Sequence, residues 1–173
     1  MPNKYGGGSK TNRVGLDYER KTSLRKALLD ATQNGLLNLD PEDFIYKKGI
    51  KVGFLAAKND LYTKFLEGVD YKAIISRQLL PDEAFINVVN KTLYIIEKKY
   101  QEGGGSADEK LQTCDFKLKQ YKKLAKTKGY DAKFIFLLGK WFNQQKYKDV
   151  LDYIISVDCL YFFDTVPISV FNI

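Results

Sequence analysis

Two short segments, Pro81-Asp82 and Glu97-Lys98-Lys99, carry carboxylates and lysines, and Glu97 follows Asp82 by fifteen positions. On neighbouring strands, two carboxylates about 4 Å apart repel each other by about 4 kcal/mol at an effective dielectric of about 20. A divalent cation between the carboxylates removes this repulsion and can activate a bound water as a nucleophile. We therefore expect Asp82, Glu97 and a lysine to form a metal-dependent site.

The residues between these segments predict the hairpin that such a site needs. Two β-rich runs, residues 84–88 and 92–101, are separated by three residues. A turn at residues 89 and 90 makes the numbers of pairing partners sum to 179, so that Asp82 lies opposite Glu97. A turn one residue later places Asp82 opposite the lysine of the same Glu-x-Lys unit. Both registers bring Asp82 to that unit.

The second of these strands is expected to be central in its sheet. Residues 93–96 are apolar without alternation, as in a strand that is covered on both faces. Because side chains alternate along a strand, Glu97, Lys99 and Gln101 share one face while Lys98 points to the other. The alternative is an ordinary ion pair between Glu97 and Lys99 at the surface, with Asp82 merely at the start of a strand.

Two helix starts are expected before this hairpin. From Leu16 to about Asn34, apolar residues recur at helical spacing, and Gly35 supplies a stop. Asp40-Pro41-Glu42-Asp43 is a second helix-start signal, because Asp can cap a helix and Pro suits its first position. Residues 50–80 give no clear pattern.

A lysine-rich helix is expected after the hairpin. Ser106-Ala107-Asp108-Glu109 is a capping box that follows the loop 102–105. The expected buried stripe consists of Leu111, Cys114, Leu118, Tyr121 and Ala125. The lysines left to solvent or phosphate are Lys110, Lys117, Lys119, Lys122, Lys123 and Lys126.

The remaining elements complete an α/β pattern. We expect a strand at 133–138, a helix at about 145–156 and a strand at 159–163. Residues 16–173 are expected to form one domain, preceded by a flexible N-terminal arm at 1–15.

Composition limits the partners and the chemistry. A net charge of +7 and a pI near 9.2 favour a polyanionic partner, first nucleic acid and second an anionic membrane surface. The chain has no histidine, which excludes Ser-His hydrolases and any histidine base or ligand. Two cysteines are too few for a disulfide framework, and no apolar run has the length of a membrane span. These features predict a cytoplasmic protein without a membrane span, whose expected partner is nucleic acid rather than a membrane.

The order of helix, strands with Asp and then Glu-x-Lys, helix and strand resembles the core of the PD-(D/E)XK nuclease superfamily over roughly residues 16–140. This resemblance implies a restriction-endonuclease-like core, with a central mixed β-sheet flanked by helices. It implies that Asp82 and Glu97 bind Mg²⁺ and that Lys99 orients the attacking water. It also suggests Glu19 as an additional acidic residue, and Gln101 as a contact to metal-bound water or DNA. Solvated surface roles for Glu19 and Gln101 are equally compatible with the sequence.

The function that the resemblance implies is Mg²⁺-dependent cleavage of double-stranded DNA, most like a type II restriction endonuclease acting as a homodimer. A repair or Holliday-junction-resolving nuclease with the same core is one alternative. A nucleic-acid-binding module without catalysis is another.

Several segments are candidates for contacts to DNA. The lysines proposed to bind its backbone are Lys110, Lys117, Lys119, Lys122 and Lys123. Tyr121 and Tyr130 are possible stacking groups, although Tyr121 falls on the apolar stripe. Residues 103–106 precede a helix and are a possible phosphate site, or simply a connector.

Overall fold

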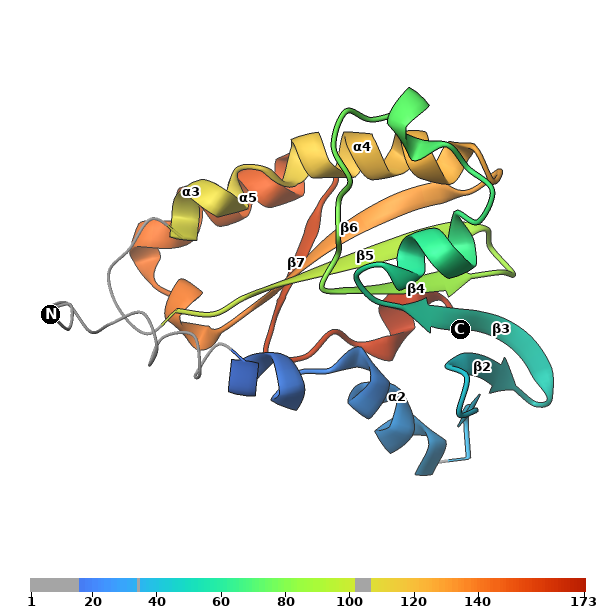
Figure 1. Cartoon of the computed structure of the whole chain (residues 1–173). Helices are drawn as coiled ribbons and strands as arrows, with labels where there is room; N and C mark the ends of the chain where they lie inside the picture. Colours follow the sequence, from blue (N-terminus) through green and yellow to red (C-terminus); the bar gives the residue numbers. More distant parts are fainter. Residues whose placement is uncertain (1–15, 34, 102–106) are drawn as a thin grey trace, which may run out of the picture.

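The computed structural model of the protein describes residues 16–33, 35–101 and 107–173, and these form a seven-stranded sheet whose strands follow chain order from β1 to β7 (Figure 1). The strands are β1 (Asn38–Leu39), β2 (Phe44–Lys47), β3 (Ile50–Ala56), β4 (Glu83–Asn87), β5 (Thr92–Lys99), β6 (Asp131–Leu138) and β7 (Leu160–Phe163). The helices are α2 (Leu24–Gln33), α3 (Ala107–Leu111), α4 (Cys114–Lys126) and α5 (Lys148–Ser156), with a further helix at 16–21.

The sheet is mixed, which confirms the expected α/β class with a central sheet flanked by helices. Strands β1 to β5 pair antiparallel, whereas β5 with β6 and β6 with β7 are parallel. Parallel neighbours need a crossover connection, and α4 and α5 lie in these two connections. The strand-rich first half and the β-α-β second half therefore meet at β5.

The predicted hairpin register is confirmed. Glu83 pairs with Ile96 and Asn87 with Thr92, so the partner numbers sum to 179. The Asn87 side chain accepts hydrogen bonds from the amides of Val89 and Asn90 at 2.8 and 3.0 Å, which fixes the turn that sets this register.

The two faces of the sheet are covered by different elements. Helices α3, α4 and α5 cover one face, and α2 with the C-terminal segment lies on the other (Figure 1). Along β5, Leu93 and Ile95 join the core beneath α4, while Tyr94 and Ile96 join the core beside α2. The central position predicted for this strand is therefore confirmed.

The helix expected from Leu16 to about Asn34 is broken. A short helix at 16–21 ends, and α2 starts at Leu24, where the main-chain N–H donates to both carboxylate oxygens of Glu83 at 3.1 Å. The apolar residues Leu24, Leu28 and Ala31 of α2 are buried, and Gly35 follows the helix with a φ of +69°, which is the left-handed conformation expected of a helix stop.

The helix start predicted at Asp40-Pro41-Glu42-Asp43 is wrong. The Asp40 side chain accepts the amides of Glu42 and Phe44 at 2.9 and 2.8 Å, which closes a tight turn between β1 and β2. The same carboxylate chemistry that caps helices also stabilises such turns, and the β-prone residues after it favour a strand.

The unassigned residues 50–80 contain β3, a π-helical turn at Leu61–Phe65 and a 3₁₀ turn at Tyr71–Ala73. The predicted lysine-rich helix is divided into α3 and α4, and its apolar stripe is buried as expected. The strand and helix predictions for the last third of the chain match β6, α5 and β7, although a 3₁₀ turn at Gln145–Tyr147 precedes α5.

The two cysteines, 45 positions apart, lie side by side. Cys114 starts α4 and Cys159 precedes β7; both thiols are free and buried. The hydrogen bond with Cys114, together with burial, raises the pKa of the Cys159 thiol. Among the described residues, no helix is both long enough and apolar enough to cross a membrane.

Candidate functional site

The candidate site lies where β4 begins and β5 ends. Asp82 directly precedes β4, and its Oδ2 accepts the main-chain N–H of Lys98 at 2.8 Å. Continuing the observed register by one residue from the Glu83–Ile96 pair places Asp82 across from Glu97. The two carboxylates therefore come from neighbouring strands, as the sequence predicted.

Glu97 is the most buried acidic group of the site, with 9% of its side chain exposed. Its Oε2 lies 3.2 Å from Nζ of Lys99 on the same strand and 3.0 Å from Nζ of Lys117 on α4. Two cations thus meet one buried carboxylate. This geometry argues against an ordinary surface pair, because burial makes the Coulomb interaction stronger and the loss of either partner more costly.

Lys58 is a member of the site that sequence reasoning missed. Its ammonium group forms an ion pair with Oδ1 of Asp82. The backbone of Lys58 is in the left-handed region, at a φ of 49°, and its N–H donates to the carbonyl of Pro81 at 2.9 Å. The residues around Lys58 carry no periodic pattern, so only its position between β3 and β4 brings it to Asp82.

The electrostatics of the site favour the charged forms of Asp82 and Lys58. Burial opposes ionisation of Asp82, but the hydrogen bonds from Lys58 and from the Lys98 amide outweigh it and hold the pKa of Asp82 below its usual value. For Lys58, burial is likewise outweighed, and Asp82, Glu19 and Glu97 together raise its pKa. All three carboxylates therefore act on one ammonium group.

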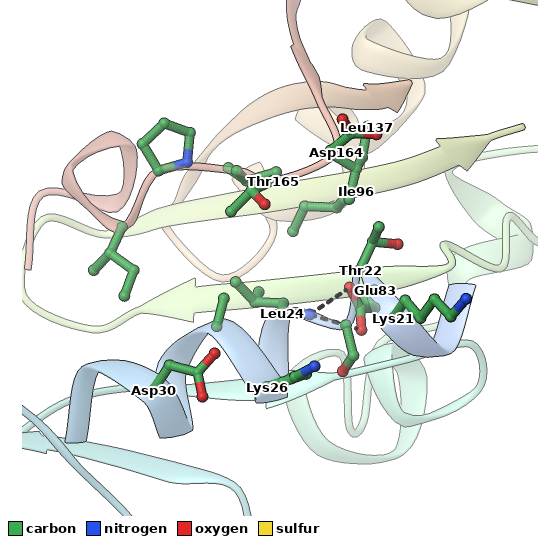
Figure 2. Close-up of a pocket in the computed structure, with 15 residues that line it drawn as sticks. Lys21, Thr22, Leu24, Lys26, Asp30, Glu83, Ile96, Leu137, Asp164 and Thr165 are labelled. Atoms are coloured by element: carbon green, nitrogen blue, oxygen red, sulfur yellow. Dashed lines mark hydrogen bonds between the residues drawn. The ribbon is translucent and has the colours of Figure 1, made fainter. Parts of the chain in front are cut away.

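Lys98 points to the opposite face of the sheet, as the alternation predicted. Its ammonium group, with 4% of the side chain exposed, lies 3.1 Å from Oε2 of Glu83 and donates to the carbonyl of Glu19 at 2.8 Å. Glu83 in turn receives the amide of Leu24, and Figure 2 shows this carboxylate directed at the start of α2 beside a cavity of about 390 Å³. This network fixes the helix at 16–21 and α2 against β4 and β5.

The two additional candidates lie near the site in different ways. The main chain of Glu19 is tied to Lys98, its side chain is exposed, and its charge reaches Lys58. Gln101 follows β5 and lines a hollow with Tyr18, Tyr100 and Trp141.

The lysines of α3 and α4 are not equivalent. Lys110, Lys122 and Lys123 are exposed as predicted, but Lys119 pairs with Asp115 at 2.7 Å. Lys117 does not face open solvent, because its ammonium group is bound to Glu97.

The aromatic candidates also differ from expectation. Tyr121 is buried beneath α4, so it is not a stacking group; burial, followed by the charge of Glu97, raises the pKa of its hydroxyl. Tyr130 is half-buried and packs edge-on against Phe65, with ring centroids 5.0 Å apart. The arm at 1–15 and the possible phosphate site at 103–106 lie outside the described residues.

Comparison with known proteins finds no matching family model, curated protein or solved structure. The donor groups themselves must therefore indicate the chemistry of the site. Carboxylate oxygens suit Mg²⁺, which is commonly held by one or two carboxylates together with waters and a substrate phosphate. The part of the chain that the structure describes contains no group of three or more Asp, Glu, His or Cys side chains able to hold a metal.

The pair Asp82 and Glu97 fits Mg²⁺ in donor chemistry and in number, with one condition. Lys58 now occupies Oδ1 of Asp82, and the Lys98 amide occupies Oδ2. The ammonium group of Lys58 must therefore move away from Oδ1 before that oxygen can bind a metal. Lys58 has a 54% exposed side chain, so solvent can receive its ammonium group.

Proposed function

We propose that this protein is a Mg²⁺-dependent endonuclease that hydrolyses phosphodiester bonds in double-stranded DNA, as type II restriction enzymes do. The proposal rests on one observation, the convergence of Asp82, Glu97 and Lys99 at the end of the central strand. The order of three antiparallel strands, a crossover helix and a parallel strand supports it, because this order agrees with the nuclease core that the sequence resembles.

In this function Asp82 and Glu97 would hold Mg²⁺, which when bound supplies an acidified water and charge stabilisation at the phosphate. Lys99, 3.2 Å from Glu97, is placed to orient the attacking water and to stabilise negative charge. Lys117 holds the same carboxylate from α4 and so positions it. A homodimer is the expected active form, because two copies related by a two-fold axis can cut both strands of a palindromic site.

The decisive experiment incubates purified protein with unmethylated phage and plasmid DNA, in Mg²⁺ or EDTA. We expect discrete fragments in Mg²⁺ only, and a loss of rate of about 10²-fold or more in Glu97→Gln, which keeps the shape but removes the charge. Glu67→Gln is the matched control, since it makes the same change at an exposed side chain outside the candidate site. Equal cleavage by wild type and Glu97→Gln would remove Glu97 from the chemistry.

A non-catalytic nucleic-acid-binding module is the second candidate. The ion pairs that already neutralise both carboxylates favour it, because such pairs can be purely structural. In that case wild-type protein would bind DNA and leave linear, supercoiled and four-way-junction substrates intact in Mg²⁺. Cleavage of junctions alone would instead indicate a junction-resolving nuclease.

A further inference from the structure

A cavity of about 550 Å³ opens directly beside Glu97, between the segment 75–80 and α4. Its apolar lining includes Ile75, Leu79 and Tyr121. Its volume lies within the range of cavities that hold small ligands, and a whole duplex is far too wide to enter it. The cavity is therefore suited to one group of nucleotide size.

The wall opposite α4 is held in place. The Tyr62 hydroxyl donates to the carbonyl of Leu79 at 2.9 Å and accepts the amide of the same residue at 3.0 Å. The Tyr62 ring packs edge-on against Tyr71, with centroids 5.0 Å apart. Because both main-chain groups of Leu79 are bound, the segment 75–80 presents a preformed surface.

The charged groups around the cavity favour a phosphate. Arg77 on the wall is exposed, and Lys117 and Lys99 both lie against Glu97. The lining thus carries two cationic side chains, Arg77 and Lys117, and one carboxylate, Glu97, which Lys99 also binds. This excess of positive charge suits the backbone of a nucleic acid.

The other lining groups suit a base. Phe116 lines the cavity from α4, is 62% exposed, and is the one aromatic residue among the exposed large apolar side chains of the described residues. Gln78 and Gln120 contribute amides to the same lining, and amides can bond the edge of a base. An exposed aromatic ring beside amides and cations is the combination that binds an unstacked base and its phosphate.

We propose that this cavity receives one unstacked nucleotide of the strand being cut, next to the scissile phosphate. Phe116 stacks on its base and Arg77 binds its phosphate. The inference rests on the proposed function and deepens it, because it adds a preference for DNA in which a base is already unpaired. Unstacking a base costs energy in a perfect duplex and much less at a bulge or mismatch.

The test measures binding of three fluorescein-labelled 20-mer substrates by anisotropy: a perfect duplex, the same duplex with a central bulge, and the single strand. The protein is full-length Glu97→Gln, alone and combined with Phe116→Ala, Phe116→Trp or Arg77→Ala. Cleavage by wild type is followed in parallel. Ile155→Ala, which alters an exposed apolar side chain on α5, is the control for Phe116.

We expect bulged DNA to bind about 10-fold more tightly than the perfect duplex. Phe116→Ala should lower the affinity for bulged DNA at least about 5-fold and the affinity for the perfect duplex less than about 2-fold. Phe116→Trp should restore the affinity for bulged DNA. Arg77→Ala should also lower the affinity for bulged DNA, whereas Ile155→Ala should leave the affinity for both substrates unchanged.

The inference would be overturned if bulged and perfect DNA bind with equal affinity and Phe116→Ala changes neither affinity. The proposed function would still stand if wild type cleaves DNA in the same experiment. A changed sedimentation coefficient of Phe116→Ala with unchanged DNA affinity would also overturn it, by assigning Phe116 to contact between copies. Wild type that neither binds nor cleaves any of these DNAs would overturn the proposed function and the inference together.

Discussion

At the scale of single residues, lysines act as the counterions of the candidate site. Lys58 neutralises Asp82, and Lys99 and Lys117 neutralise Glu97. For Asp82, the hydrogen bonds from Lys58 and from the Lys98 amide outweigh burial and keep the pKa of its carboxyl below the ordinary value. The site therefore places lysine ammonium groups against two carboxylates, and under the proposed function Mg²⁺ would replace Lys58 at Asp82.

The Lys58–Asp82 pair has a testable pH dependence. The folded-state pKa of Asp82 lies below its ordinary value of 3.8, so its stabilising contribution is complete above about pH 4 and is lost as the pH falls through the lower folded value. Removing the cation in Lys58→Ala should raise the pKa of Asp82 and shift the acid-unfolding midpoint to higher pH. Carboxyl NMR titration and circular dichroism against pH would measure both.

Lys64→Ala is the control for this experiment, since Lys64 forms only an exposed pair with Asp60, four residues earlier on the chain. Equal acid midpoints for the two variants would show that the Lys58 pair does not control the ionisation of Asp82.

At the scale of elements, a polar network joins four segments beside the sheet. Glu83 on β4 binds Lys98 on β5 and the first amide of α2, and Lys98 also holds the carbonyl of Glu19. The helix breaks at residues 22–23 because this carboxylate, 59 positions away from Leu24, satisfies an N–H at the start of α2. One side chain thus positions both the helix at 16–21 and α2.

Removing the Glu83 carboxylate should destabilise the fold. Glu83→Ala would leave the Lys98 ammonium group buried without its ion partner and would remove the bond to the Leu24 amide, so we expect a loss of about 3–5 kcal/mol in unfolding free energy. Urea denaturation followed by circular dichroism would measure this loss.

Two further variants calibrate that result. Glu83→Gln keeps a hydrogen-bond acceptor and should lose less unfolding free energy than Glu83→Ala. Glu67→Ala changes an exposed side chain and should keep an unfolding free energy within about 0.5 kcal/mol of wild type. A Glu83→Ala variant as stable as Glu67→Ala would show that the network contributes nothing to the fold.

At the scale of the whole molecule, the lysines behind the net charge of +7 differ in their surroundings. Several lysines form ion pairs with nearby carboxylates, such as Lys119 with Asp115 and Lys148 with Asp152. Lys122 and Lys123 instead stand exposed on α4, the helix that also carries Lys117 to the candidate site. The face bearing α4 is therefore the surface on which we expect a polyanion to lie.

Salt dependence would locate this surface. The double variant Lys122→Ala/Lys123→Ala should weaken DNA binding and reduce the slope of log affinity against log salt by about 2, because each lost phosphate contact releases about 0.9 fewer counterions. Anisotropy titrations between about 50 and 200 mM salt would measure the slope. Lys148→Ala on α5 should leave the slope unchanged. An equal reduction of the slope by Lys148→Ala and by the double variant would indicate that DNA binding is not confined to α4.

Local patterns in the sequence predicted the β4–β5 hairpin, the opposite faces of Glu97 and Lys98, and the buried stripe of α3 and α4. They limited the hairpin to two registers, and the structure has the one in which partner numbers sum to 179. Turn length and side-chain alternation act over a few residues, so they can be read without knowledge of the fold. Asp40 misled this reasoning because one carboxylate can cap a helix or close a turn with the same local hydrogen bonds.

Only the tertiary structure decided which distant groups meet. The pairing of Lys58 with Asp82, of Lys117 with Glu97 and of Cys114 with Cys159 depends on strand order and on where the crossover helices pack. No period or motif near Lys58 or Lys117 distinguishes it from the chain's other lysines. The two carboxylates and Lys99 were predictable from the sequence, but Lys58 and Lys117 were not, because ion pairs between distant elements follow from packing rather than from spacing along the chain.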